Sequence, residues 1–239
     1  MKILAIDSSS MVATVAVVTD EILNAEYTIN HKKTHSQTLL PMIDEIKKTI
    51  DLDMETLDAI AVSKGPGSYT GLRIGSATAK GFGLALNIPI ISVPTMDALA
   101  YNMFSTKYLV CPIMDARRGQ VYTGLYSFEQ DEMIVQKEQC IMMIDDLIDE
   151  LNKREEPVIF LGDGVDTQKD IIEEKLNIPH FYAPSSMNRQ KASSVAALGM
   201  VYYKQGKYEP AAEHKPEYLR LSQAERELKE KMAQKNDQH

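Results

Sequence analysis

Hydrophobic and polar positions follow a strand pattern through the first thirty residues and a helical pattern after them. The segments ILAID (3–7), ATVAVVT (13–19) and ILNAEYTI (22–29) are mostly apolar, and the connections between them are too short for a crossover helix. They therefore predict three strands in an antiparallel meander. In residues 36–50 the apolar positions recur at helical spacing, which predicts a helix with Ser36 as its N-cap.

Helices and strands alternate in the next part of the chain. Residues 58–63 (DAIAVS) predict a strand, and a glycine-rich loop and a helix to about Leu86 follow it. Residues 89–93 (PIISV) predict another strand, with a short helix from Thr95. Three meandering strands followed by alternating helix and strand is the order of a ribonuclease-H-like unit.

The second half of the chain repeats this order. VCPIMD (110–115) ends in an aspartate, as ILAID (3–7) does. The elements expected after it are strands at 119–128, 133–143 and 157–164 and a helix at 144–153. A duplicated unit predicts an α/β fold of two lobes, each a mixed sheet with flanking helices, facing a cleft. This is the architecture of the actin-like ATPase superfamily, whose members bind ATP between the lobes.

The lobes are expected to divide near residue 104. Residues 1–104 would form the N-terminal lobe, 105–221 the C-terminal lobe, and 222–239 a charged C-terminal helix or tail.

The stretch SKGPGSYTGLRIGSATAKGFGLAL (63–86) contains six of the twelve glycines. It matches neither the dinucleotide-binding pattern nor the P-loop, so a tight turn is favoured over an anion site at the helix N-terminus. Within the helix, Gly71, Gly75, Ala79 and Gly83 recur every four residues and form a smooth ridge. Such a ridge predicts close packing, either within the same chain or against another subunit, and the pattern leaves both open.

Charge and composition limit the classes of function. The chain has 26 Lys and Arg against 34 Asp and Glu, a formal net charge of -8, which disfavours a protein that grips a nucleic-acid backbone alone. Two cysteines indicate no disulfide framework. The N-terminus lacks the pattern of a signal peptide and no apolar run approaches a membrane span, so a cytoplasmic protein with no membrane contact is expected.

Candidate metal ligands are few. His31 and His35 have the i, i+4 spacing of a zinc pair, but Lys32 and Lys33 lie between them and the glutamate of a zinc peptidase is missing. We therefore expect no metal site.

Turns that contact nucleotide in the two-lobed ATPases suggest a vestigial nucleotide site. Its candidate residues are Asp7, Ser8, Ser9, Asp115, Gly162 and Gly164. The turn after the first strand reads DSSS and lacks the glycines that let a backbone approach phosphate. An ATP-dependent small-molecule kinase is therefore an alternative function and not the expected one.

Five segments together resemble the TsaB family, also called YeaZ, over nearly the whole chain. They are the glycine stretch (63–86), HSQTLLPMID (35–44), MDARRGQVY (114–122), FLGDG (160–164) and PEYLRLSQAE (216–225). The resemblance implies a non-catalytic scaffold or activator in bacterial synthesis of threonylcarbamoyladenosine, the modified nucleoside next to the anticodon of tRNA. It implies action with the transferase TsaD and the ATPase TsaE, with ATP or ADP and most of the tRNA held by those partners and no cofactor of its own.

The same resemblance implies how the chain differs from TsaD. In the TsaD pattern, a metal-binding Asn-His-x-x-x-His motif follows the strand after the glycine loop. Here Pro94 and Thr95 replace Asn-His, and Leu99 stands at the second histidine. The TsaD metal site is thus expected to be absent, while a metallopeptidase remains a second alternative function.

The resemblance also implies a docking surface on helices 36–50 and 71–86, used for TsaD and for a homodimer of the isolated chain. Leucine and isoleucine side chains would be apolar anchors, some of them facing the chain's own sheet, and the glycine ridge would allow close approach. The expected contact residues are Ser36, Leu39, Leu40, Ile43, Gly71, Arg73, Gly75, Ala79, Lys80 and Gly83.

Overall fold

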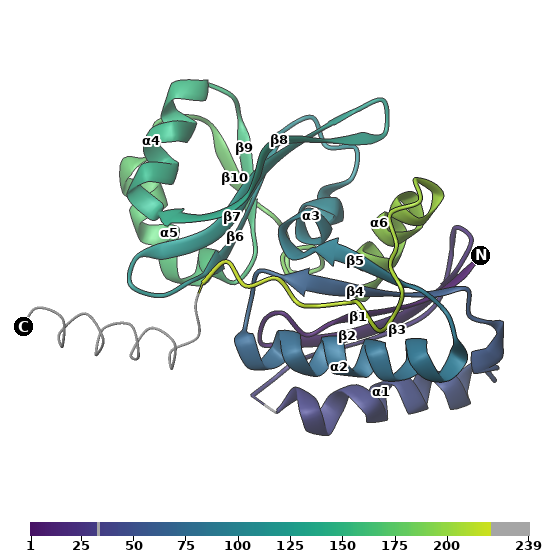
Figure 1. Ribbon diagram of the computed structural model, residues 1–239. Coiled ribbons are helices and arrows are strands. Elements are labelled where there is room, and N and C mark those ends of the chain that lie inside the picture. Colours follow the sequence, from purple (N-terminus) through teal and green to yellow (C-terminus); the bar gives the residue numbers. More distant parts are fainter. Residues whose placement is uncertain (33, 221–239) are drawn as a thin grey trace, which may run out of the picture.

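The structure is a computed structural model and describes residues 1–32 and 34–220. Figure 1 shows two lobes, each built on one five-stranded sheet. The predicted α/β fold with two ribonuclease-H-like lobes is confirmed.

The first sheet has the strand order β3-β2-β1-β4-β5. Its strands are β1 (Lys2–Asp7), β2 (Val12–Thr19), β3 (Ile22–Asn30), β4 (Ala59–Gly65) and β5 (Ile90–Pro94). The first three strands pair antiparallel, as predicted, while β4 and β5 run parallel to β1. Residues on β1 alternate between the two faces of the sheet, so Leu4 and Ile6 enter one core and Ile3 and Ala5 the other.

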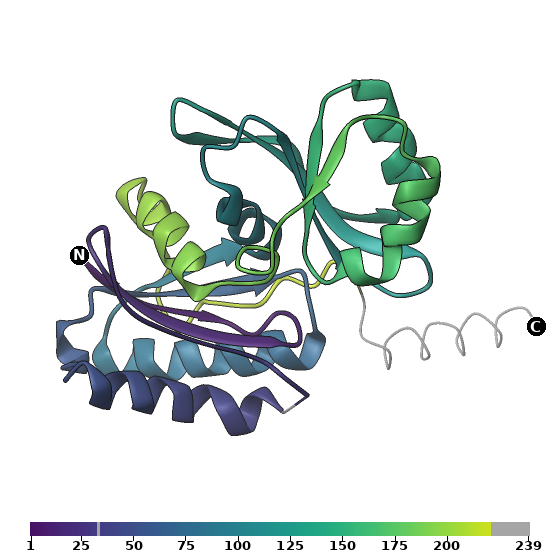
Figure 2. The same cartoon turned by 180° about the vertical axis from the view of Figure 1, so that it is seen from behind.

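Helices cover both faces of this sheet. The helices α1 (His35–Thr49) and α2 (Tyr69–Leu86) lie on one face, and α6 (Ala192–Lys204) lies on the other (Figures 1 and 2). The N-cap of α1 is Thr34, so the predicted cap at Ser36 is wrong, and Ser36 lies in the first turn of the helix. The short η1 (Met54–Thr56) precedes β4.

The second sheet has the strand order β10-β9-β6-β7-β8, which repeats the pairing of the first. Its strands are β6 (Leu109–Asp115), β7 (Gln120–Glu129), β8 (Glu132–Met143), β9 (Val158–Leu161) and β10 (His180–Tyr182). The helices α4 (Ile144–Arg154) and α5 (Gly164–Lys175) share a buried cluster with this sheet. The predicted duplication of one unit agrees with this topology.

The chain crosses from the second lobe back to the first at α6, which differs from the prediction that residues 105–221 all belong to the C-terminal lobe. Ala192, Val195 and Ala196 on α6 are buried against β1, β2 and β4 of the first lobe. No prediction covered α5, β10 or α6. The short α3 (Thr95–Ala100) and η2 (Tyr101–Met103) lie where the lobes meet.

Residues 207–220, here called the strap, run along the first lobe after α6. The strap forms an antiparallel bridge between Glu209 and Ile90, and the Glu217 amide donates to the Lys64 carbonyl at 2.6 Å. The predicted tail at 222–239 lies outside the described residues. None of the helices in the described part of the chain combines the length and hydrophobicity needed to cross a lipid bilayer.

Candidate functional site

A cavity of about 740 Å³ lies between the lobes. Its walls come from the β1–β2 turn and the start of α2 in the first lobe, the β6–β7 turn in the second lobe, and the end of the strap. The lining residues are Ser9, Ser10, Met11, His35, Gly67, Ser68, Tyr69, Thr70, Met114, Asp115, Ala116, Arg117, Tyr122, Asp163, Tyr218, Leu219 and Arg220.

Asp7 is buried at the end of β1, and its carboxylate accepts hydrogen bonds from the chain itself. One carboxylate oxygen accepts from the Ser9 amide at 2.8 Å and from the Ser9 hydroxyl at 2.7 Å, and the other accepts from the Ser63 hydroxyl at 2.6 Å. Burial raises the pKa of Asp7 above its ordinary value. The residues that line the cavity do not include Asp7.

The turn after β1 packs directly against two glycines of α2. The buried Ser8 hydroxyl donates to the Gly71 carbonyl at 2.8 Å. A β-carbon on Gly75 would lie 2.5 Å from the Ser8 hydroxyl oxygen, and one on Gly71 would overlap the Ser8 carbonyl. These two glycines therefore let the helix touch the turn.

The whole predicted ridge is buried in its own chain, which corrects its assignment to a partner contact. Gly71 and Gly75 face the β1–β2 turn, Gly83 faces Ala211 of the strap, and Ala79 belongs to the core beneath the first sheet. Close packing within the chain was the alternative that the sequence left open. Leu39 and Ile43 on α1 are also buried in this core, while Leu40 is 54% exposed.

The second lobe contributes Asp115 and Asp163 to the cleft. The Asp115 carboxylate accepts a hydrogen bond from the Arg117 backbone amide at 2.7 Å. The backbone amide of Asp115 donates to the Asp163 carboxylate at 3.3 Å. Burial raises the pKa of Asp163. The predicted Gly162 and Gly164 pack on the backbone of Ile113 and do not line the cleft.

Of the six predicted nucleotide-site residues, only Ser9 and Asp115 line the cavity. The residues that sequence reasoning missed include Asp163 and the strap residues Tyr218 and Arg220. Asp163 stands inside the motif LGDG, which could have indicated it. The strap carries no periodic pattern that would have placed it here.

The strap connects the two lobes along one wall of the cleft. The Tyr218 ring packs on Tyr69 of α2, with 4.7 Å between ring centroids, and its hydroxyl accepts from Arg73 at 3.2 Å. Farther along, the Arg220 guanidinium donates to the Ala116 carbonyl of the second lobe. The first lobe is thereby tied to the β6–β7 turn.

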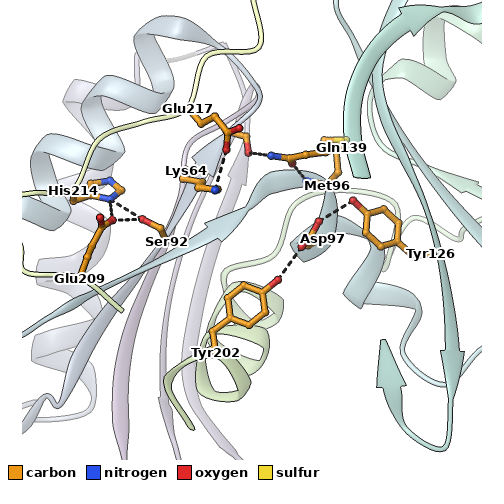
Figure 3. Close-up of polar contacts among 11 residues, drawn as sticks. Lys64, Ser92, Met96, Asp97, Tyr126, Gln139, Tyr202, Glu209, His214 and Glu217 are labelled. Atoms are coloured by element: carbon orange, nitrogen blue, oxygen red, sulfur yellow. Dashed lines mark hydrogen bonds and ion pairs between the residues drawn. The ribbon is translucent and has the colours of Figure 1, made fainter. Parts of the chain in front are cut away.

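Two further contacts hold the strap on the first lobe (Figure 3). His214 Nδ1 lies 2.9 Å from the Glu209 carboxylate and 2.8 Å from the Ser92 hydroxyl. The Lys64 ammonium forms an ion pair with Glu217 at 2.9 Å. Because a carboxylate only accepts, Nδ1 of His214 carries the proton.

Lys80 was predicted as a flanking partner contact, and in the structure its side chain contacts the strap. Its ammonium donates to the carbonyls of Ala212 and His214 at 2.9 and 3.1 Å.

The positions of the TsaD histidines are occupied by core residues. Thr95 and Leu99 are both buried on α3, and Leu99 packs in the cluster beneath the second sheet. His35 donates from Nε2 to the Ser10 carbonyl at 2.8 Å. Within residues 1–32 and 34–220, no group of three His, Cys, Asp or Glu side chains is placed to hold a metal ion.

The outer face of α2 exposes small and apolar residues. Leu84 is 59% exposed there, and Ala77 and Gly81 are exposed on the same side. Among the described residues, none outside the helix itself places an atom within 4 Å of the β-carbon position of Gly81.

Two ribonuclease-H-like lobes that face a cleft are the fold of the actin-like ATPase superfamily. A model of the family "TsaD: tRNA N6-adenosine threonylcarbamoyltransferase" matches residues 23–228. The tRNA threonylcarbamoyladenosine biosynthesis protein TsaB of Bacillus subtilis is 37% identical over 94% of this chain and 96% of its own length. TsaB of Escherichia coli is 34% identical over 55% of this chain and 57% of its own.

Solved structures agree with this fold. YeaZ from Pseudomonas aeruginosa superposes with a TM-score of 0.77 at 24% identity, covering 91% of this chain and 99% of that one. Component A of (R)-2-hydroxyglutaryl-CoA dehydratase from Acidaminococcus fermentans superposes with a TM-score of 0.50 at 10% identity, covering 87% and 100%. The chain belongs to the TsaB (YeaZ) family of tRNA threonylcarbamoyladenosine biosynthesis proteins.

Proposed function

We propose that the chain is a non-catalytic scaffold or activator subunit of the complex that adds a threonylcarbamoyl group to the adenosine next to the anticodon of tRNA. It acts with the transferase TsaD and the ATPase TsaE. The similarity to B. subtilis TsaB over 94% of the chain supports this role. So do the commitment of Asp7 to internal hydrogen bonds and the core packing of Thr95 and Leu99.

The outer face of α1 and α2 is the docking surface in this proposal, and Gly81 is the observation that carries it. A glycine inside a helix costs about 1 kcal/mol relative to alanine. Internal packing accounts for Gly71, Gly75 and Gly83, whereas among the described residues nothing beyond the helix fills the space beside Gly81. A glycine on an exposed ridge lets the helix of a partner approach closely.

Exposed leucines on the same two helices supply the apolar part of this surface. Leu40 on α1 and Leu84 on α2 are 54% and 59% exposed. Burying such a side chain at an interface stabilises the complex through the hydrophobic effect. The docking surface therefore consists of Leu40, Ala77, Gly81 and Leu84, and it replaces the buried ridge predicted from the sequence.

The remaining parts of the proposal concern ligands and location. The isolated chain forms a homodimer through the same surface. ATP or ADP and most tRNA contacts belong to the partner subunits, which fits a chain with a net charge of -8. The chain needs no cofactor of its own and works in the cytoplasm, where the tRNA is modified.

A bulky substitution at Gly81 tests the docking surface. Gly81→Leu introduces a good helix former at an open position, so the chain should fold as before. Its affinity for purified TsaD, measured by calorimetry, should fall at least about tenfold. The control Asp170→Leu places the same side chain at an exposed position of α5 in the second lobe and should bind normally. A folded Gly81→Leu variant with full affinity for TsaD would refute this surface.

Reconstitution tests the role itself. Threonylcarbamoylation of tRNA by TsaD and TsaE should require the chain. Full modification without it, phosphotransfer by the chain alone, or stoichiometric zinc in the purified protein would each contradict a non-catalytic subunit.

A further inference from the structure

Asp97 on α3 touches both lobes with a single carboxylate (Figure 3). One oxygen accepts from the hydroxyl of Tyr126, which lies on β7 of the second lobe, at 2.8 Å. The other accepts from the hydroxyl of Tyr202, which lies on α6 of the first lobe, also at 2.8 Å. The Asp97 residue is only 4% exposed, so the carboxylate depends on these two donors in place of water.

Gln139 forms a second polar contact across the same junction. It lies on β8 of the second lobe, and its side-chain amide donates to the Gly65 carbonyl of β4 at 3.1 Å. Its side-chain oxygen accepts from the Met96 amide at 3.4 Å, next to Asp97 on α3. The helix α3 is thus tied to strands of the second lobe on one side and to α6 of the first lobe on the other.

These contacts make rotation of one lobe against the other unfavourable. A rotation would carry Tyr126 and Tyr202 in different directions, so at least one hydroxyl would leave the carboxylate. A buried carboxylate that loses a donor without gaining water is strongly destabilised. Burial also raises the pKa of Asp97 above its ordinary value.

We propose that Asp97 is an interlobe latch: by accepting hydrogen bonds from Tyr126 and Tyr202 on opposite lobes, it makes the two lobes one rigid body and keeps the cleft between them from closing or opening. The strap contact between Arg220 and the Ala116 carbonyl is a separate link between the two lobes. This inference concerns the free chain and does not depend on the docking surface or on TsaD.

Distance measurements between the lobes test the latch. Spin labels on Glu21→Cys in the first lobe and Lys153→Cys in the second, both at exposed positions, report the interlobe distance in a Cys140→Ser background. Cys111 is fully buried and stays in place. Dilution with unlabelled chain removes distances between copies of a dimer.

The expected result separates latch variants from a control. The labelled protein with all its tyrosines should give one narrow distance distribution. The control Tyr203→Phe removes a hydroxyl from the neighbouring position on α6 and should give the same distribution. Tyr202→Phe, and more so Tyr126→Phe with Tyr202→Phe, should broaden it or add a second peak while circular dichroism stays native. An unchanged narrow distribution in the folded double variant would overturn the latch.

The fully buried Tyr126 is the riskier position to alter, so Tyr202→Phe alone keeps the test decisive. Tyr202 is half-buried, and its replacement removes one hydroxyl without a change in ring packing. Hydrogen exchange of the α3 and β8 amides should accelerate in this variant relative to Tyr203→Phe. Equal exchange in the two variants would also count against the latch.

Discussion

Gly83 lies against Ala211: a β-carbon on the glycine would stand 2.7 Å from the β-carbon of the alanine. Helix α2 and the strap therefore meet where neither has room for a larger residue. Two positions earlier, Gly81 faces open space among the described residues. One residue type thus has two roles on one helix, close packing inside the chain at Gly83 and an open surface at Gly81.

Alanine at these two glycines should change stability in opposite directions. Gly81→Ala should raise the free energy of unfolding by up to about 1 kcal/mol, because alanine has the higher helix propensity and meets no neighbour. Gly83→Ala should lower it by about 1–3 kcal/mol, because the added methyl overpacks the contact with Ala211. Urea unfolding of both variants measures the difference, and equal effects would contradict the packing described here.

Leu39 and Leu40 are adjacent on α1 but should respond differently to truncation. Leu39 is 1% exposed and belongs to the core, so Leu39→Ala should lower the free energy of unfolding by about 2–5 kcal/mol. Leu40 is 54% exposed, so Leu40→Ala should change stability by less than about 0.5 kcal/mol. For binding to TsaD the exposed residue should matter directly, so Leu40→Ala should weaken the affinity measured by calorimetry. A Leu40→Ala variant with unchanged affinity would remove Leu40 from the surface.

The strap should depend on Gly65 far more than on its ion pair. Gly65 has a φ of 119°, and a β-carbon there would overlap the Glu217 carbonyl, so Gly65→Ala should lower the free energy of unfolding by at least about 1–3 kcal/mol. Glu217→Gln breaks only a partly exposed pair with Lys64 and should change it by less than about 1 kcal/mol. Thermal and urea unfolding compare the two. A larger loss from Glu217→Gln would show that the ion pair holds the strap.

His214 should make stability depend on pH in mildly acidic solution. Burial lowers its pKa below the ordinary value of 6.5, and Nε2 finds no hydrogen-bond partner among the described residues. Between the lowered folded pKa and 6.5 the unfolded chain binds more protons than the folded chain, so stability falls as the pH drops through this window. Above 6.5 the contribution is fully present.

His214→Asn isolates this effect, since an asparagine amide can still donate to Glu209 but does not titrate. Its free energy of unfolding should decrease less between pH 7 and pH 5 than that of the unaltered chain. Burial raises the pKa of Asp7 and Asp97, which changes stability in the opposite direction, but both variants share those groups. Parallel pH profiles for the two proteins would rule out His214 as the source.

Local pattern was sufficient to predict most of the secondary structure between residues 3 and 161. The antiparallel meander at the start, the helix after the glycine loop and the repeated order in the second half all follow from periodicity and turn residues. These features are determined by neighbours within a few positions, so a single sequence contains them. The family resemblance followed from the same short motifs, and the comparison with B. subtilis TsaB confirmed it.

The sequence by itself determined that α2 has a smooth ridge of small residues, but only the tertiary structure decided what that ridge touches. Its neighbours include strap residues far along the chain, as in the contact of Lys80 with Ala212, 132 positions apart. Likewise, Asp97 receives its two tyrosines from positions 29 and 105 residues away. A helical period shows that one side of α2 can approach something closely. Which segment packs against that side of α2 depends on how α6 and the strap return to the first lobe. No local sequence pattern predicts that return.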